Sequence, residues 1–222
     1  MTMINKIFSI LQKDLKIEFS KGHLFFSVIL YVVSSIYIVY LSFQPSGLFN
    51  LEVWVSIFWI LILFASISSV SKSFFQESQK RNLYYYFIVS PDELIISKLV
   101  YNFLFLSGIV LLTFIIFSFL LGDIIISKNF FVVLLILGSF SISNCLTLIS
   151  AISYQVENNS LIISVLGFPV ILPILLLLIR ISKISSIDFS WNLIREDIYL
   201  LILLNIILLA LTKVLFNYLW RN

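Results

Sequence analysis

The chain has 222 residues, of which 61% are hydrophobic, and 14 Lys and Arg against 11 Asp and Glu give it a formal net charge of +3. Its mean hydropathy of +1.12 decides against a single soluble domain and for a small membrane protein. A single cysteine excludes an internal disulfide and a metal cage built from cysteines.

Residues 3–22 are predicted to form an amphipathic helix ahead of the first long apolar run. Its apolar stripe follows helical spacing and consists of Ile4, Ile7, Phe8, Leu11, Leu15 and Phe19. Lys6, Lys13, Asp14 and Lys16 lie mainly off that stripe. Such a helix suits the inner membrane interface, where its lysines reach anionic lipid headgroups. A simple membrane anchor is the first interpretation, and transmission of force to a partner is the alternative.

Six long apolar runs follow, of which only the last contains a charged residue, Lys213. They lie at residues 24–43, 53–71, 99–122, 129–156, 158–179 and 198–220. Each is about as long as the ~20 residues that a helix needs to cross a ~30 Å hydrocarbon core. The runs lack the polar–apolar alternation of a membrane β-barrel. The prediction is one all-α integral membrane domain over residues 1–222, with six transmembrane helices in 23–222.

Small and hydroxyl side chains in the fourth run favour close helix packing, with a polar translocation face as the alternative. Ser139, Ser143, Thr147 and Ala151 recur at four-residue spacing there, and Asn144 lies beside them. Three tryptophans near the ends of runs suit the aromatic belt of a membrane protein, namely Trp54, Trp191 and Trp220.

The fifth run contains the sequence "GFPVILP". Pro169 and Pro173 each remove a backbone donor and disturb the preceding helical turn. A kink or a break near the middle of the membrane is therefore predicted. It is either merely structural or the flexible part of a moving outer gate.

The basic residues predict the orientation, because they concentrate on the cytoplasmic side of membrane helices. An internal N-terminus puts ten of them inside, namely Lys6, Lys13, Lys16, Lys21, Lys72, Lys80, Arg81, Lys98, Lys213 and Arg221. The four outside are Lys128, Arg180, Lys183 and Arg195. Both termini are therefore predicted to be cytoplasmic, and residues 180–197 to form the longest outer loop.

The largest inner loop contains "QESQKRNLYYYFIVSPDELIISK", residues 76–98, where charges and tyrosines gather. Residues 74–88 suit a helix that presents Glu77, Lys80 and Arg81, and "SPDEL" suits a new helix start with two carboxylates near its positive end. The chain has no phosphate-binding P-loop, no H-E-x-x-H and only one histidine, His23. We therefore expect neither an enzyme nor a metal site, and the largest inner loop is the natural place to receive work from another protein. The alternative is a solvated loop that is held to the lipid headgroups.

The stretch "FWILILFASISSVSKSFFQESQKRNLYYYFIVSPDELIISKLVYN", residues 58–102, resembles the CcmB family, the haem exporter B permeases of cytochrome c maturation. The family positions are occupied by Phe75, Gln76, Glu77, Leu83, Tyr84, Ser90, Pro91 and Lys98. "LQKDLKIEFSKG" and "GFPVILPILLL" resemble the N-terminal helix and the proline pair of the same family.

The resemblance implies a fold like that of type-2 ABC permeases, in a multi-pass subunit of the bacterial plasma (inner) membrane. It implies a second copy, a cytosolic ABC ATPase, a membrane haem-handling subunit and a small membrane subunit as partners, besides membrane lipid and without nucleic acid. No cofactor is expected to be bound firmly, and haem enters as cargo or through a partner.

The segment 72–98 is then predicted to couple the chain to the ATPase. The residues assigned to this coupling are Gln76, Glu77, Arg81, Tyr84, Tyr85, Pro91 and Lys98. The expected function is haem export or the ATP-driven release of a haem-loaded chaperone. The alternatives are a type-2 ABC permease for a polysaccharide, lipid or drug, and a coupling scaffold that transports nothing.

Overall fold

A computed structural model describes residues 3–21, 23–43, 50–75, 89–122, 124–153, 159–187 and 191–219. Within those residues the chain forms seven α-helices and no strand. They are α1 (Met3–Lys21), α2 (His23–Phe43), α3 (Leu51–Phe75), α5 (Pro91–Leu121), α6 (Lys128–Ser153), α7 (Asn159–Ile187) and α8 (Trp191–Leu219).

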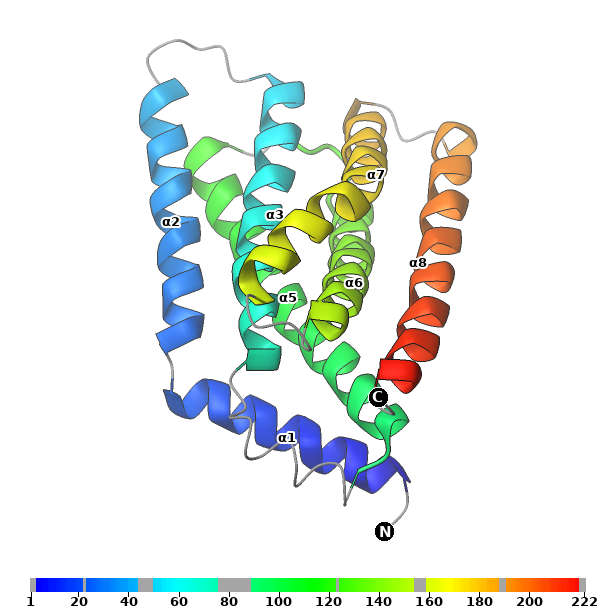
Figure 1. Ribbon diagram of the computed structural model, residues 1–222. Coiled ribbons are helices and arrows are strands. Elements are labelled where there is room, and N and C mark those ends of the chain that lie inside the picture. Colours follow the sequence, from blue (N-terminus) through cyan, green and yellow to red (C-terminus); the bar gives the residue numbers. More distant parts are fainter. Residues whose placement is uncertain are drawn as a thin grey trace.

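Six of these helices are long and apolar enough to cross a membrane, as the sequence predicts. The candidate spans are Phe25–Phe43, Leu51–Ser69, Pro91–Leu121, Lys128–Ser153, Val165–Ser186 and Trp191–Tyr218. In Figure 1 the long helices form one bundle and α1 lies across one of its ends. The beginning of α5 and the end of α8 lie at the same end, which we call the α1 end.

Helix α6 forms the centre of the bundle and contacts α3, α5, α7 and α8. Its hydroxyl row packs inside the chain, since Ser139, Ser143 and Thr147 are fully buried. The amide of Asn102 on α5 donates a hydrogen bond to the Thr147 hydroxyl at 2.9 Å. The row therefore serves helix packing in this conformation, which was the first interpretation of its spacing.

Aromatic side chains fill the core near the opposite end of the bundle. Trp54 and Phe58 of α3 stack with their ring centroids 5.4 Å apart, and Phe117 of α5 meets Trp54 edge to face at 4.8 Å. Trp54 is fully buried and its indole N–H donates to the Gly122 carbonyl oxygen at 3.2 Å. Its assignment to an interfacial belt was wrong, because this ring packs inward from the helix end, whereas Trp191 is half exposed.

The outer surfaces of the bundle are apolar, as expected for helices in contact with lipid. On α2 the most exposed large side chains include Phe26, Leu30 and Ile38, and on α8 they include Leu203 and Val214. Isolated soluble proteins rarely expose apolar surface on this scale. The exposed surface thus agrees with the composition in indicating a multi-pass membrane protein.

Residues 180–197 do not form the long loop predicted for them. Helix α7 continues to Ile187 and α8 begins at Trp191, so most of this stretch is helical. The guanidinium Nε of Arg180 lies 3.2 Å from a carboxylate oxygen of Asp197, which joins the two helix ends. Charges end an apolar run without ending a helix, so hydropathy alone placed the end of α7 too early and the start of α8 too late.

Helix α7 remains helical through Pro169 and Pro173. Both prolines lie on the exposed side of the helix, while Gly167 faces inward. In Figure 1 the ribbon of α7 changes direction along its length, and its yellow first part lies at an angle to the rest. A mechanical role for this bend stays a prediction.

Candidate functional site

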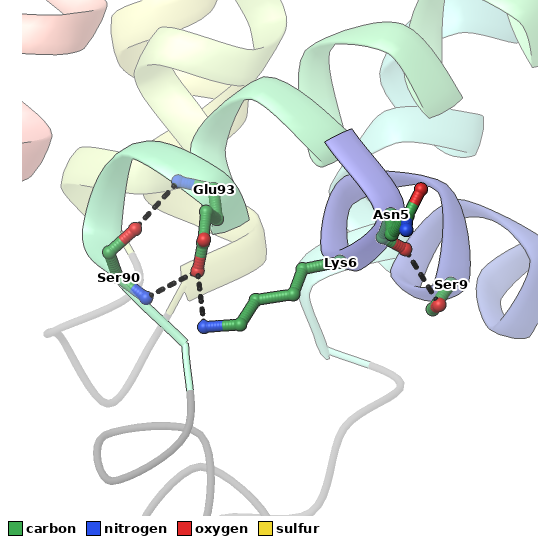
Figure 2. Close-up of polar contacts among 5 residues, drawn as sticks. All are labelled: Asn5, Lys6, Ser9, Ser90 and Glu93. Atoms are coloured by element: carbon green, nitrogen blue, oxygen red, sulfur yellow. Dashed lines mark hydrogen bonds and ion pairs between the residues drawn. The ribbon is translucent and has the colours of Figure 1, made fainter. Parts of the chain in front are cut away.

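The start of α5, which the "SPDEL" sequence predicts, is built by a capping box. Ser90 is the N-cap, and its hydroxyl accepts the Glu93 backbone N–H at 3.4 Å. The Glu93 carboxylate in turn accepts the Ser90 backbone N–H at 2.9 Å. Pro91 follows in the first turn, where a missing N–H costs no intrahelical hydrogen bond. Figure 2 shows the two reciprocal bonds, which fix where α5 begins.

The same Glu93 carboxylate also connects α5 to α1. The ammonium group of Lys6 lies 3.6 Å from its Oε2 atom, and Figure 2 shows the lysine reaching from α1 towards the cap. The Glu93 side chain is only 8% exposed, whereas the Lys6 side chain is 34% exposed. One carboxylate thus closes the helix cap and contacts the crossing helix.

A second ion pair joins the two helices further along. Lys98 Nζ lies 3.0 Å from Asp14 Oδ2, and Lys13 Nζ lies 3.1 Å from Asp14 Oδ1. The side chains of Lys98 and Asp14 are 4% and 7% exposed. Charges are buried in this way only when they compensate each other, because removing one partner leaves the other desolvated and uncompensated.

A small apolar cluster separates the two ion pairs. Ile10 lies one turn after Lys6 and one turn before Asp14, so the three side chains share one face of α1. This cluster consists of the buried residues Ile10, Val89, Leu94, Ile95, Ala151 and Phe216. Helix α1 therefore packs on the bundle through a face that differs from its apolar stripe, where Phe8 stays 57% exposed.

Helix α8 reaches the same place through Asn217, whose amide donates to Asp92 Oδ1 at 3.0 Å. The adjacent carboxylates Asp92 and Glu93 thus hold two different helices at the start of α5. We call the set of Lys6, Asp14, Ser90, Asp92, Glu93, Lys98 and Asn217 the α5 junction. Its carboxylates are engaged in capping, in ion pairs and in an amide contact, so the arrangement is suited to holding helices together.

Two of the seven predicted coupling residues lie among the described residues. Pro91 occupies the first turn of α5, and Lys98 is buried against Asp14. Because its side chain is 4% exposed, Lys98 presents little surface for direct contact with a partner chain, and its coupling role and that of Pro91 stay predictions. The other five, namely Gln76, Glu77, Arg81, Tyr84 and Tyr85, lie outside the described residues, as do residues 76–88 of the helix predicted at 74–88. Their coupling role stays a prediction.

Sequence reasoning missed the role of Asp14, whose partner lies 84 positions further along the chain. The available signal was charge placement, since Lys6 and Asp14 have opposite charges two turns apart on one face of a helix. Over the described ranges, no group of three or more His, Cys, Asp or Glu side chains is placed to hold a metal ion.

The helix bundle and the α5 junction lie within a match to a known protein family. Residues 5–218 match the family CcmB, described as CcmB protein, which covers α1, all six spans and the α5 junction. Comparisons with curated proteins and with solved structures gave no match. The match spans nearly the whole length of the chain, and we conclude that the protein belongs to the CcmB family, a membrane component of the haem-exporter ABC system of cytochrome c maturation.

Proposed function

We propose that the chain is the permease subunit through which a separate ATPase acts in cytochrome c maturation, either to export haem or to release a haem-loaded chaperone. The observation that carries the proposal is the α5 junction. Residues 76–88, with their charges and tyrosines, lead directly into the Ser90 cap. Because the segment joins the end of α3 at Phe75 to the start of α5, a displacement of it would act on both helix ends.

Helix α5 is suited to carry such a displacement into the membrane. It is one continuous helix of 31 residues, with its first turn in the junction and its remainder in the apolar bundle. The Asn102–Thr147 hydrogen bond connects it to the central helix α6. A motion at the junction thus has a direct path to the core through packed side chains.

The orientation proposed for this function puts the α1 end on the cytoplasmic side of the bacterial inner membrane, where a soluble ATPase has access. The excess of Lys and Arg in the segments at that end supports it. Reporter fusions at Gly47 and Lys80 test the orientation, and Lys80 is expected inside. Equal labelling of both positions from the outside would contradict it.

The proposed partners are a cytosolic ABC ATPase, a membrane haem-handling subunit, a small membrane subunit and a second copy of the chain. The family supports an assembly of this kind. A coupling scaffold that moves no haem is a second candidate, favoured by the fully buried hydroxyls of Ser139, Ser143 and Thr147, which α6 keeps inside the chain. Reconstitution with the ATPase, followed by an assay for haem movement, separates the two candidates.

The coupling assignment is tested by Glu77→Lys and Tyr84→Ala. Each is expected to reduce co-purification of the ATPase or to uncouple hydrolysis from maturation, while the protein still inserts at normal levels. Charge pairs buried in an interface typically lose ~2–5 kcal/mol when one partner is removed. A matched control is Glu196→Lys, an exposed residue near the start of α8. If both variants bind and mature cytochrome c normally, the segment is only a solvated loop.

A further inference from the structure

We propose that the Asp14–Lys98 and Lys6–Glu93 pairs form a two-point clamp that fixes α1 across the start of α5, so that α1 and α5 move as one body. The inference rests on the proposed function in one respect, namely that the motion it constrains is driven by the ATPase. It makes Asp14 a positioning residue, to which the sequence pattern assigned no role.

Two separated contacts constrain the direction of a crossing helix, which a single contact does not. Lys6 and Asp14 are eight residues apart, or ~12 Å along the axis of α1 at 1.5 Å per residue. A helix held at a single point can pivot about it, whereas a second contact at this distance fixes its direction. Ile10 lies between the two contacts and is buried, which keeps the intervening turn against α5.

The order of charges also selects one arrangement of the two helices. Along α1 the clamp presents a cation and then an anion, while α5 presents Glu93 and then Lys98. If α1 crossed in the reverse direction, Lys6 would approach Lys98 and Asp14 would approach Glu93. Like charges in a buried contact disfavour that arrangement. The two pairs therefore fix the direction in which α1 crosses α5, besides attracting the two helices to each other.

The two contacts are unequal. The Lys6 side chain is 34% exposed, so water and salt screen its pair with Glu93. Lys98 and Asp14 are nearly fully buried, and Asp14 is shared with Lys13 on its other oxygen. Asp14 is thus the residue on which the clamp depends most, and its replacement removes the attraction for two lysines at once.

The first test measures whether α1 stays on α5, independently of any partner. Ile10→Cys introduces a thiol at the buried centre of the clamp, while the single native cysteine, Cys145, is buried in α6. In membranes this thiol should react slowly with a maleimide. Asp14→Lys or Lys98→Asp should speed the reaction by about tenfold, because local opening exposes the thiol. The double charge swap Asp14→Lys with Lys98→Asp should restore slow labelling.

The second test uses the same variants with the ATPase present and measures cytochrome c matured per ATP hydrolysed. We expect the two single variants to lose most of this yield at equal membrane levels, and the charge swap to recover it. Gln12→Lys adds a positive charge to an exposed position of α1 and is the matched control. If a charge-reversed variant inserts poorly into the membrane, the uncharged variants Asp14→Asn and Lys98→Met are tested in its place.

Each result has a defined meaning. Slow labelling of the single variants would overturn the two-point clamp, because α1 would then stay on α5 without the Asp14–Lys98 pair. Fast labelling with an unchanged yield would overturn the positioning role of α1. If the unaltered chain shows no ATPase-dependent maturation, the proposed function fails, while the labelling results still decide whether the ion pairs hold α1 on α5.

Discussion

The indole N–H of Trp59 on α3 donates to the hydroxyl oxygen of Ser182 on α7 at 2.9 Å, with both residues fully buried. Ser182 in turn donates to the Leu178 carbonyl oxygen at 2.6 Å, so its hydroxyl is used as both donor and acceptor. This close packing of α3 and α7 requires a glycine on the neighbouring helix α6. A Cβ at Gly138 of α6 would lie 2.6 Å from Cη2 of the Trp59 ring and 3.1 Å from Cδ2 of Leu178.

We therefore expect Gly138→Ala to displace the Trp59 ring and weaken its bond to Ser182. Overpacking of this kind typically costs about 1–3 kcal/mol. Thermal unfolding in detergent measures the loss. Gly108→Ala in α5 is the matched control, because a Cβ there meets nothing within 4 Å. If the two variants are equally stable, the contact between α3 and α6 accommodates the added methyl group without loss of stability.

A second buried polar contact joins α6 to α8 and predicts a coupled pair of mutations. Asn205 donates to the Ser141 hydroxyl at 2.7 Å and to the Leu201 carbonyl at 2.9 Å, and it accepts from Asn144 at 3.1 Å. Asn205→Leu should lower the free energy of unfolding by about 1 kcal/mol, because it removes the acceptor for the buried Asn144 amide.

The double variant Asn144→Leu with Asn205→Leu should lose less stability than the sum of the single variants, because no unpaired amide then remains. Unfolding of all four chains in detergent measures the coupling. Asn192→Leu, at an exposed position of α8, controls for the effect of adding leucine. Strict additivity would show that the two amides do not depend on each other.

The six spans could be predicted from the sequence because each apolar run alone is long enough to cross a membrane. Their ends were less accurate wherever charged residues belong to the same helix. The fifth run was predicted to end at residue 179, yet α7 continues past Arg180 and Lys183 to Ile187. Helix α5 begins at Pro91, ahead of its apolar run at 99–122, at the helix start that the "SPDEL" sequence predicted.

The α5 junction could be predicted only in part. The cap is local, and its four residues carry a recognisable pattern. The Asp14–Lys98 pair depends on how α1 crosses α5, which no local pattern encodes. The inward direction of Trp54 likewise follows from the packing of α5 and α6 around it, through Phe117 and Phe131.

The Arg180–Asp197 pair predicts an unequal response to the loss of either partner. The Arg180 side chain is 67% exposed and the Asp197 side chain is 9% exposed. Arg180→Gln leaves a buried carboxylate without this cation, whereas Asp197→Asn leaves a cation that is largely exposed. We expect the arginine variant to be less stable by about 1–2 kcal/mol.

Chemical or thermal unfolding in detergent ranks the two variants of this pair. Arg195→Gln, at an exposed position of α8, is the control for the loss of a positive charge and should change stability little. If Asp197→Asn proves the more harmful variant, the guanidinium rather than the carboxylate is the group that needs its partner.

The prolines of α7 predict a change in helix shape. Replacing Pro169 and Pro173 by leucine restores two backbone N–H donors and should straighten the helix while leaving membrane insertion intact. Phe168, directly before the first proline, meets Phe64 of α3 with the ring centroids 6.0 Å apart. A straighter α7 should move its first part relative to α3 and separate these rings.

Cysteines at positions 64 and 168, joined by a short thiol cross-linker, report this separation, and cytochrome c maturation reports its consequence. Cross-linking and maturation should both fall in the double proline variant. Val170→Leu, between the two prolines, adds a leucine without a new donor and should change neither measurement. Normal maturation with reduced cross-linking would show that α7 has moved and that its bend has no mechanical role, because a gate that depends on the bend cannot work after the helix has been straightened.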